Sequence, residues 1–439
     1  MHPHPAARRV KAVVKSHQTE NKEDMTTDTN NSNQNPVPGE QPEWKPADRL
    51  GLVSEYYFSR KLREVARLNA EGRDIISLAI GSPDMPPSPQ TIERLCEVAR
   101  RPDAHGYQPT MGTPELRQAM AAFYRRWYGV ELEPGSEVLP LIGSKEGILH
   151  VTLAFVNPGD AVLVPNPGYP TYTSLSRLLG AEVLHYDLCE GTWQPDFDAL
   201  ENIVAHHQRV RLLWTNYPNM PTGADARRDT YERLVAFARR HHVIVVNDNP
   251  YSFILNDHPL SLLQVPGAKD CCIEFNSMSK SHNMPGWRVG LCATNAQFIS
   301  WILKVKSNID SGTFRGLQLA AAEALNTNDA QWHREANIET YARRRRYAEQ
   351  IMQELGCTYD ARQVGMFLWG RIPDVYADAE QLTERVLHEA RVFITPGFIF
   401  GSRGQRYIRI SLCAKEEKIE EALERIKSGL TQLQEGERK

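Results

Sequence analysis

The sequence predicts an α/β protein that combines a large domain, built on a mostly parallel doubly wound sheet, with a smaller α+β domain. Two observations support this prediction. Apolar runs of strand length alternate with helical stretches in the middle of the chain, for example at residues 183–186, 212–215 and 243–247 around a helix at 230–240. Such alternation is typical of parallel strands with helices on both faces. From about residue 328 the pattern changes to a long amphipathic helix followed by short strands.

The predicted domain boundaries follow these changes of pattern. Residues 1–47 are polar and end in a Pro-rich segment, so they are expected to be a disordered tail. Residues 48–85 would be the N-terminal segment of the small domain, and residues 86–327 would form the large domain. The small domain would continue over residues 328–430, with short strands at 367–370 and 392–395 and helices at 382–390 and 419–430. Residues 431–439 are expected to be a flexible end.

Composition excludes several classes of function. The chain has 439 residues, of which 41% are hydrophobic, and a formal net charge of −3, so it can bury a large core. A slightly acidic chain lacks the positive surface of a protein that binds nucleic acid or an anionic membrane. No apolar run approaches the roughly 18 to 20 residues that span a bilayer. Seven cysteines are scattered without a CxxC pair, which favours reduced thiols and a cytoplasmic protein.

Two basic stretches need a separate interpretation. Residues 1–17 are basic and free of acidic residues, but they lack the apolar segment of a signal peptide. We interpret them as part of the tail, or as sequence upstream of a start at Met25. The four arginines at 343–346 lie on the predicted long helix among Glu335, Glu339, Glu349 and Glu354, and we interpret them as its solvated face.

The first folded elements follow from periodicity and capping signals. Apolar residues recur at helical spacing over 57–68, and an apolar run at 75–80 ends in the turn signal Gly81-Ser82-Pro83-Asp84. Thr113, followed by Pro114, is predicted to cap a helix that Gly129 ends.

Two strand ends further along the chain carry residues suited to a ligand. After a predicted strand at 139–142, the turn Gly143-Ser144-Lys145-Glu146-Gly147 opens a helix, where free N–H groups and the helix dipole favour an anion. After a predicted strand at 161–164, Tyr169 lies between prolines in Asn166-Pro167-Gly168-Tyr169-Pro170-Thr171-Tyr172, where its ring can lie flat on a planar ligand.

The strongest chemical signal is the stretch Ser277-Met278-Ser279-Lys280-Ser281-His282-Asn283-Met284-Pro285-Gly286-Trp287-Arg288-Val289-Gly290, between apolar runs at 271–275 and 289–293. Partial burial and the positive charge of Arg288 would lower the pKa of Lys280 and make its amine a nucleophile. The hydroxyls of Ser277 and Ser279 and the guanidinium of Arg288 suit a phosphate. A Schiff-base lysine beside a phosphate clamp indicates pyridoxal phosphate (PLP).

This stretch resembles the cofactor-lysine signature of the class I and II aminotransferases, the fold-type I enzymes that use PLP. Six or seven motifs between Arg49 and Gly429 occur in the order of that family, and the ordered set is more specific than any one motif. The turn at 143–147 and the segment Lys306-Ser307-Asn308-Ile309-Asp310-Ser311-Gly312 are most similar to the subgroup of LL-diaminopimelate and alanine-type aminotransferases.

The resemblance implies roles for single residues. Lys280 would be the catalytic residue that forms the Schiff base with PLP and then moves a proton to and from the substrate α-carbon. Tyr169 would stack on the cofactor ring, Asp248 would pair with its pyridine nitrogen, and Tyr251 would donate to its phenolic oxygen. The residues that would bind the phosphate are Ser144, Lys145, Ser277, Ser279 and Arg288, joined by Tyr107 from the partner of a homodimer. Gly81 and Arg409 would contact the substrate, with Arg409 on its α-carboxylate. No metal is implied.

One position departs from the family pattern. Family members usually read N-N-P-T-G, with the second asparagine bonded to the phenolic oxygen of the cofactor, whereas this chain has Asn219-Met220-Pro221-Thr222-Gly223. A methionine cannot donate that hydrogen bond. Tyr251 would then be the main direct donor, unless Asn216 or Asn219 has replaced the missing amide.

The predicted function is a PLP-dependent aminotransferase that moves the amino group of an L-amino acid to a 2-oxo acid by a ping-pong mechanism. One alternative is a PLP-dependent C–S lyase, because one lysine can serve both reactions on this fold. A remote alternative is a PLP-sensing regulator domain, although the N-terminal tail has no helix-turn-helix pattern. The amino donor stays open: Arg315 could meet a side-chain carboxylate of the substrate or lie on the surface.

Overall fold

The structure is a computed structural model that describes residues 44–55 and 57–429 with their side chains, and residues 430–436 as backbone. The chain divides into two units, Met1–Ala47 and Asp48–Lys439. The tail predicted at residues 1–47 lies outside the described residues as far as residue 43. The same holds for the last three residues of the predicted flexible end, whereas helix α14 (Glu416–Gly436) continues beyond residue 430.

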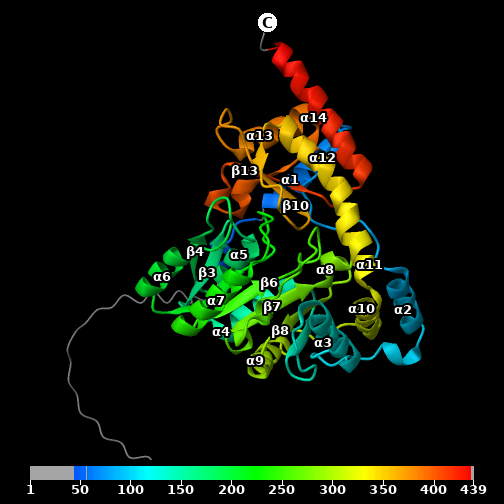
Figure 1. Ribbon diagram of the computed structural model, residues 1–439, viewed down its shortest axis with the longest axis vertical. Coiled ribbons are helices and arrows are strands. Elements are labelled where there is room, and N and C mark those ends of the chain that lie inside the picture. Colours follow the sequence, from blue (N-terminus) through cyan, green and yellow to red (C-terminus); the bar gives the residue numbers. More distant parts are fainter. Residues whose placement is uncertain (1–43, 56, 437–439) are drawn as a thin grey trace, which may run out of the picture. The chain divides into compact units, whose positions relative to one another are not determined.

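A seven-stranded sheet forms the centre of the unit Asp48–Lys439 (Figure 1). Five neighbouring strands are parallel, while β8 is antiparallel to both β7 and β2. The predicted, mostly parallel sheet is therefore confirmed, with one strand reversed. In spatial order the strands are β2 (Val138–Leu141), β8 (Gly290–Ala293), β7 (Cys272–Ser277), β6 (Ile244–Asp248), β5 (Val210–Thr215), β3 (Ala161–Asn166) and β4 (Glu182–Asp187).

Successive strand residues point to opposite faces of this sheet, and each face has its own apolar core. In β3, Val162 and Val164 pack into one core and Ala161 and Leu163 into the other. The first core is closed by α4 (Ser144–Phe155), α5 (Pro170–Leu178) and α9 (Ala296–Lys306). The second is closed by α3 (Pro114–Tyr128), α6 (Phe197–His206), α7 (Arg228–His241) and α10 (Arg315–Thr327), and α2 (Pro89–Ala99) packs on α10.

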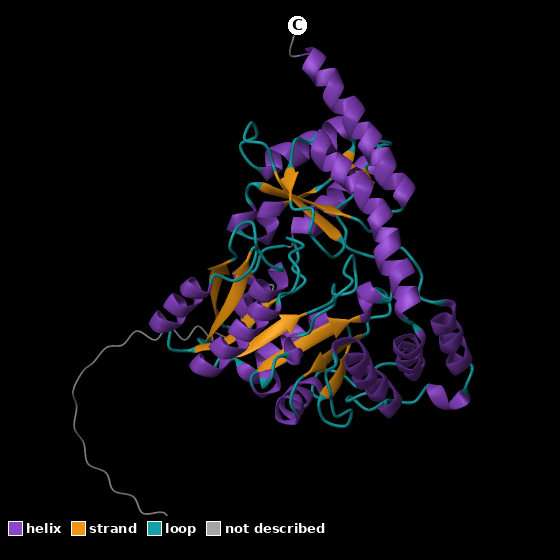
Figure 2. Ribbon diagram, in the orientation of Figure 1, coloured by secondary structure: helices purple, strands orange, loops and turns teal. Residues whose placement is uncertain are grey.

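A second, antiparallel sheet has the order β12-β13-β10-β9 and packs against helices (Figure 2). Its strands are β9 (Thr358–Tyr359), β10 (Phe367–Arg371), β12 (Thr395–Pro396) and β13 (Tyr407–Ser411). Strand β1 (Ile76–Ser77) pairs in parallel with β11 (Val392–Phe393), so the N-terminal segment joins the C-terminal part of the chain. The helices of this part are α1 (Tyr57–Ala70), α12 (Thr340–Glu354), α13 (Ala379–Arg385) and α14. The domain boundaries at residues 86 and 328 stay a prediction, because Asp48–Lys439 is one unit.

Short helices complete the described chain. Single helical turns are α8 (Met278–Ser281) and α11 (Ala330–His333), and two segments are π-helical, η5 (Arg334–Glu339) and η6 (Val386–Ala390). The 3₁₀ helices are η1 (Asp48–Leu52), η2 (Pro102–Ala104), η3 (Leu262–Gln264), η4 (Ala268–Asp270), η7 (Gly397–Phe400) and η8 (Ser402–Gly404). No helix in the described part of the chain is long and apolar enough to cross a membrane.

Several sequence predictions can be compared with these elements. Thr113 caps α3 by accepting from Leu116 N, and Gly129 ends it in the left-handed region, as predicted. The helix predicted from residue 328 to 356 is instead α11, η5 and α12 in succession. Lys280, predicted at a strand end, lies in α8 directly after β7.

The solvated face predicted for the arginines at 343–346 is wrong for Arg344, and the side chain of Arg345 is also only 13% exposed. Arg344 is only 5% exposed, and its Nη1 and Nη2 donate to the two carboxylate oxygens of Asp84 at 2.8 and 2.9 Å. Arg345 does pair with Glu349 one turn along the helix, at 2.7 Å. Periodicity within the helix could not reveal Asp84 as a partner, because the two residues are 260 positions apart.

Candidate active site

A cavity of about 440 Å³ lies where β6 and β7 end, between the seven-stranded sheet and the four-stranded sheet. Its walls include every residue that the sequence predicted for the site except Tyr107. The predicted residues that line it are Gly81, Ser144, Lys145, Tyr169, Asp248, Tyr251, Ser277, Ser279, Lys280, Arg288 and Arg409. Segments far apart in the sequence therefore meet at one site.

The turn at Gly143 forms a cradle with Arg288. Gly143 has φ 74° and precedes α4 without a side-chain cap, so the first N–H groups of the helix are available to a ligand. A Cβ on Gly143 would lie 2.2 Å from Nη2 of Arg288, so only glycine fits there. Nη1 of Arg288 donates to the carbonyl of Pro285 at 3.0 Å and to Oγ of Ser279 at 3.4 Å. Helix N–H groups, a hydroxyl and a guanidinium in one place fit a phosphate.

Lys280 has the environment of a nucleophilic amine. Its Nζ donates to the carbonyl of Gly81 and faces the cavity. Burial lowers the pKa of Lys280, and the positive charges of Arg288 and Arg409 act in the same direction, while Cys413 and Asp248 oppose them. A lowered pKa increases the share of neutral amine that can attack a carbonyl.

Asp248 ends β6 with one of its carboxylate oxygens available. Oδ2 accepts from the hydroxyl of Tyr172 at 2.9 Å, whereas Oδ1 is buried with no hydrogen-bond partner among the described residues. Burial raises the pKa of Asp248 to about 6, although the hydrogen bond from Tyr172, the nearby hydroxyl of Ser144 and the charge of Lys280 oppose the shift. A buried acceptor without a partner costs free energy, so a cationic N–H at Oδ1 would be stabilising. The protonated pyridine nitrogen of PLP fits this requirement.

Two tyrosines border the same space. Tyr169 is half-buried and packs edge-on against Tyr172, whose ring stacks on Trp214 with centroids 5.1 Å apart. Burial, followed by the charge of Asp248, raises the pKa of Tyr251, so its hydroxyl stays protonated and can donate. A stacking face and a phenolic donor complete a set that fits PLP.

Arg409 is held rigidly on the opposite wall. It lies in β13 and is 4% exposed, and its Nη2 donates to the carbonyl of Ala79 at 2.8 Å. Its guanidinium lies over the rings of Phe367 and Phe400, at 4.0 and 4.7 Å from their centroids, while Nη1 is 3.2 Å from Sδ of Met220. A fixed planar fork of donors suits a carboxylate.

Gly81 is required for a reason that the sequence did not show. A Cβ there would lie 2.3 Å from Cζ of Phe367. The absence of a side chain on Gly81, which was predicted to let the substrate approach, also leaves room for the ring of Phe367.

Some residues lie elsewhere than the resemblance suggested. Tyr107 is 94% exposed and does not line the cavity of its own chain. Arg315 is also absent from the cavity wall, and its guanidinium is 3.5 Å from Asp103 and 3.9 Å from Glu115.

Other wall residues were missed in the sequence. Tyr172 had a usable signal, because it follows Tyr169 by one helical turn within the same motif. The other missed residues are apolar and come from several parts of the chain: Phe58 and Leu62 on α1, and Ala79, Ile80, Pro250, Pro285, Phe367 and Phe400.

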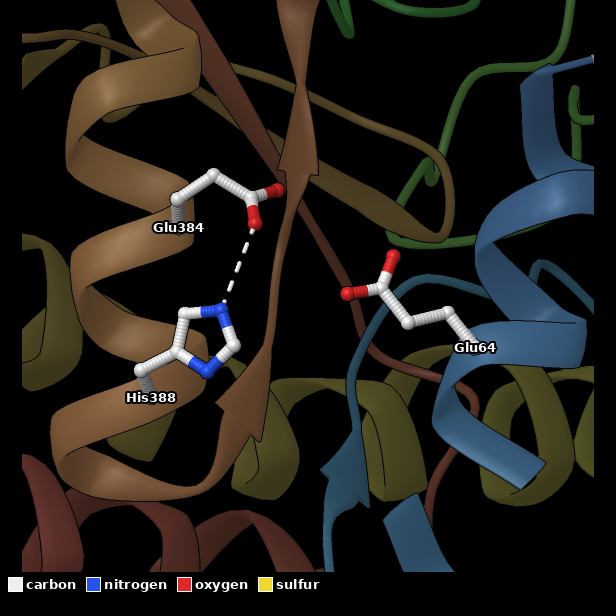
Figure 3. A group of neighbouring side chains, drawn as sticks. All are labelled: Glu64, Glu384 and His388. Carbon is white, nitrogen blue, oxygen red and sulfur yellow. Dashed lines mark ion pairs between the residues drawn. The ribbon is translucent and has the colours of Figure 1, made fainter. Parts of the chain in front are cut away.

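Two groups of side chains in the described chain have the residue types of a metal site. Figure 3 shows Glu64, Glu384 and His388 between α1 and the helix that contains α13 and η6. Nζ of Lys61 lies 2.9 Å from Glu64 and also contacts Glu384, so a lysine already supplies the cation. The other group is Glu146, His150 and Asp310. Nζ of Lys306 lies 2.9 Å from Glu146 and 2.6 Å from Asp310, so a lysine supplies the cation there too.

The chain matches the family described as aminotransferase class I and II over residues 73–426. It is 43% identical over 386 residues to an LL-diaminopimelate aminotransferase of Oleidesulfovibrio alaskensis, covering 87% of this chain and 98% of that protein.

Solved structures agree. Substrate-bound BacF from Bacillus subtilis superposes with a TM-score of 0.82 at 35% identity, covering 88% of this chain and 98% of the other. An aromatic aminotransferase from Pyrococcus horikoshii superposes with a TM-score of 0.78 at 30% identity, covering 88% of this chain and 99% of the other. The chain therefore belongs to the class I and II aminotransferases, whose members use PLP, and is an aminotransferase.

Proposed function

We propose that the cavity holds PLP, with Lys280 as the residue that forms the Schiff base. The observation that carries this proposal is the convergence of three groups on one cavity: Nζ of Lys280, the unpartnered Oδ1 of Asp248 and the guanidinium of Arg409. The phosphate would lie against the N–H groups of Ser144 and Lys145, the hydroxyls of Ser277 and Ser279, and the guanidinium of Arg288. Tyr169 would stack on the ring.

When bound, PLP supplies an electron sink for the pair of electrons left at the substrate α-carbon. The residues of the chain do the rest. Arg409 would bind the α-carboxylate and orient the α-carbon toward Lys280, whose neutral Nζ would take the proton from the α-carbon and deliver it to a carbon of the cofactor. Oδ1 of Asp248 accepts from the pyridine N–H and keeps that nitrogen protonated, and the hydroxyl of Tyr251 donates to the phenolic oxygen.

The proposal extends to assembly and location. Tyr107 is almost fully exposed in one chain, which supports a homodimer in which it reaches the phosphate site of the partner subunit. All seven cysteines are free, which supports a reducing compartment and hence the cytoplasm.

For the amino donor, the geometry supports an apolar or aromatic side chain. Apart from Lys145, whose proposed role uses its backbone N–H and whose Nζ lies 6.0 Å from the ring centroid of Tyr169, the charged side chains of the cavity have proposed roles in binding PLP or the α-carboxylate. Most of what remains for the substrate side chain is apolar, above all the wall of Phe58, Leu62, Ile80, Pro285, Phe367 and Phe400. An ionised side chain would lose its water there without gaining a partner. The second candidate is LL-diaminopimelate, which the name of the 43% identical relative supports.

A donor screen tests these alternatives. We expect kcat/KM for phenylalanine, leucine and methionine to exceed that for aspartate, glutamate and LL-diaminopimelate by about tenfold or more, because a buried polar group left unpaired costs about 1 to 3 kcal/mol and a charged one costs more. The 2-oxo acid product is followed with a fixed acceptor, and Lys280→Ala is the blank. A preference for LL-diaminopimelate would reject the apolar assignment. Pyruvate release from cystathionine without an acceptor would add a C–S lyase activity.

A matched variant shows whether this wall selects the donor. Leu62 lies on α1 and lines the cavity. Leu62→Arg should raise kcat/KM for aspartate and glutamate and lower it for leucine, while Leu62→Met should leave the order of donors unchanged. Parallel losses for every donor in Leu62→Arg would show that this wall does not contact the substrate side chain.

A further inference from the structure

The buried cluster around Lys306 lies just outside the cavity. Nζ of Lys306 donates to Oε1 of Glu146 at 2.9 Å and to Oδ2 of Asp310 at 2.6 Å. Nε2 of His150 lies 2.6 Å from the same Glu146 oxygen and 3.8 Å from Asp310. The side chains of His150 and Lys306 are 0% and 3% exposed. A buried ion network is stabilising only when each member is paired, so removing the ammonium would leave two carboxylates facing each other.

Glu146 connects this cluster to the turn before α4. Its Oε2 accepts from the backbone N–H of Ile142, and its own N–H donates to the carbonyl of Gly143 at 3.2 Å. The two bonds enclose residues 143–145, whose N–H groups are proposed to bind the phosphate. Burial opposes ionisation of Glu146, but hydrogen bonds with His150, Asp310 and Lys306, together with the charge of Lys306, prevail and its pKa is lowered. The carboxylate that holds the turn is therefore charged, and Lys306 helps to keep it so.

Asp310 connects the cluster to a second loop. Its Oδ1 accepts from the N–H of Gly312 at 3.1 Å. Gly312 has φ 78°, and a Cβ on it would lie 2.6 Å from the carbonyl oxygen of Gln108, the neighbour of Tyr107. Lys306, Gly312 and Arg288 also line one small cavity behind the phosphate turn. Lys306 thus joins two segments that flank the same anion site without lining the active-site cavity itself.

We propose that Lys306 is a positioning residue for the cofactor phosphate: its ammonium fixes Glu146, and Glu146 fixes the turn at residues 143–145 in the geometry that receives the phosphate. Lys306 acts through this turn and touches neither cofactor nor substrate. The inference rests on the proposed function, because it needs PLP in the cavity.

The test measures release of PLP from the full-length holoenzyme by loss of its visible absorbance in excess inorganic phosphate. Lys306→Met removes the charge and keeps most of the length, and we expect release to be about tenfold faster or more, as for breaking a buried ion network. Lys306→Arg should restore slow release in part. Lys304→Met, an exposed lysine on the same helix, should match the wild type. Release from Lys306→Met at the wild-type rate would overturn the proposal.

A second comparison separates positioning from general loss of stability. Full-length chains are reconstituted with PLP or with pyridoxal, which lacks the phosphate, and the affinity of each is measured by absorbance. Lys306→Met should weaken PLP binding and leave pyridoxal binding within about twofold, since only the phosphate meets the turn. Equal losses for both would overturn the proposal.

If Lys306→Met does not fold, Glu146→Gln replaces it and should show the same selective loss. The wild type itself tests the parent proposal. If it binds PLP no better than pyridoxal, or if Arg288→Lys has no effect on PLP, the phosphate cradle fails whatever Lys306 does. If the wild type and Arg288→Lys support the phosphate cradle but Lys306→Met binds PLP like the wild type, only the positioning role of Lys306 is rejected.

Discussion

Met220 lies in the wall of the cavity with its thioether against a guanidinium. Sδ is 3.2 Å from Nη1 of Arg409, and Met220 N donates to Oδ1 of Asn216 at 2.7 Å. Nδ2 of Asn216 donates to the carbonyl of Asp248. One N–H of the Asn216 amide is therefore used by the backbone, and Nδ2 of Asn219 donates to the carbonyl of Asn216 at 3.1 Å. Tyr251 is left as the proposed donor to the phenolic oxygen of PLP.

Met220→Asn should add a second donor near that oxygen. A hydrogen bond to an anionic oxygen stabilises it and weakens its hold on the neighbouring proton, so the pH midpoint of the visible absorbance should fall by about one unit. Spectrophotometric pH titration of the wild type and the variant measures the shift. Met220→Leu, of similar size and without a polar atom, should keep the midpoint. An unchanged midpoint in Met220→Asn, with an altered donor preference, would assign Met220 a steric role.

The sequence predicted a site residue when its reactive side chain and the residues that support it lie within one short segment. Lys280 with its serines and Arg288, the turn at Gly143, and Asp248 at a strand end are of this kind. The apolar wall could not be predicted in the same way, because Phe58, Phe367 and Phe400 meet only after the chain has folded. The contact of Met220 with Arg409 joins residues 189 positions apart, and no local pattern encodes it.

At the scale of elements, the helix that leads into α12 contains a π-helical segment next to Lys280. In η5, Nδ2 of Asn337 donates to the carbonyl of Ser281, the residue after Lys280, at 2.8 Å and lies 2.9 Å from Nδ1 of His333. Helical periodicity predicted one continuous helix, because a single wide turn hardly changes the pattern of apolar residues. The wide turn follows instead from tertiary hydrogen bonds, and such π segments often occur at functional sites. The reversed direction of β8 was not predictable for a similar reason, since apolar patterns carry no strand direction.

Two histidines pack beside this turn, and their burial affects how stability depends on pH. His282 and His333 are buried, with ring centroids 5.1 Å apart. Burial lowers the pKa of His333 to about 3, with Arg126 adding to the shift and Asp329 opposing it. Burial also lowers the pKa of His282 well below its usual value, assisted by the repulsion that a protonated His333 would add and by the charge of Arg126. Both rings are therefore neutral in the folded protein at neutral pH.

The sign of the pH dependence follows from these shifts. An unfolded histidine titrates near pH 6.5, so below that pH the unfolded chain binds protons that folded His333 rejects, and stability falls as the pH falls. At pH 5 the loss from His333 is about 2 kcal/mol. His333→Phe keeps an aromatic ring but removes the titratable group. In this variant the difference in unfolding free energy between pH 7.5 and pH 5 should be smaller than in the wild type by about 2 kcal/mol. Denaturant titration at both pH values checks it, and an unchanged difference would show that His333 does not drive the acid sensitivity.

At the scale of the whole molecule, the alternation of strands and helices predicted the architecture because it reports which residues are buried on two faces of a sheet. It carries no information about surfaces that meet another chain. Tyr107 is the clearest example, since it is 94% exposed while the next residues, Gln108 and Pro109, pack against Gly312. Ile309, in the segment that leads to Gly312, is also exposed. An exposed aromatic ring on a rigid segment is a typical interface residue.

The proposed homodimer makes a prediction that a single chain cannot satisfy. If each site takes Lys280 from one subunit and Tyr107 from the other, neither Lys280→Ala nor Tyr107→Ala has an intact site. A hybrid of the two variants has one, because Lys280 of the Tyr107→Ala chain meets Tyr107 of the partner subunit. Unfolding and refolding an equal mixture should form hybrids as half of the dimers, each with one intact site in two, and restore about a quarter of wild-type activity. Refolding each variant alone is the control. Mixing can restore activity only when the two subunits share their sites. If the activity of the mixture never exceeds the mean of the two variants while the wild type refolds fully, Tyr107 either contributes to the site of its own chain or contributes to no site.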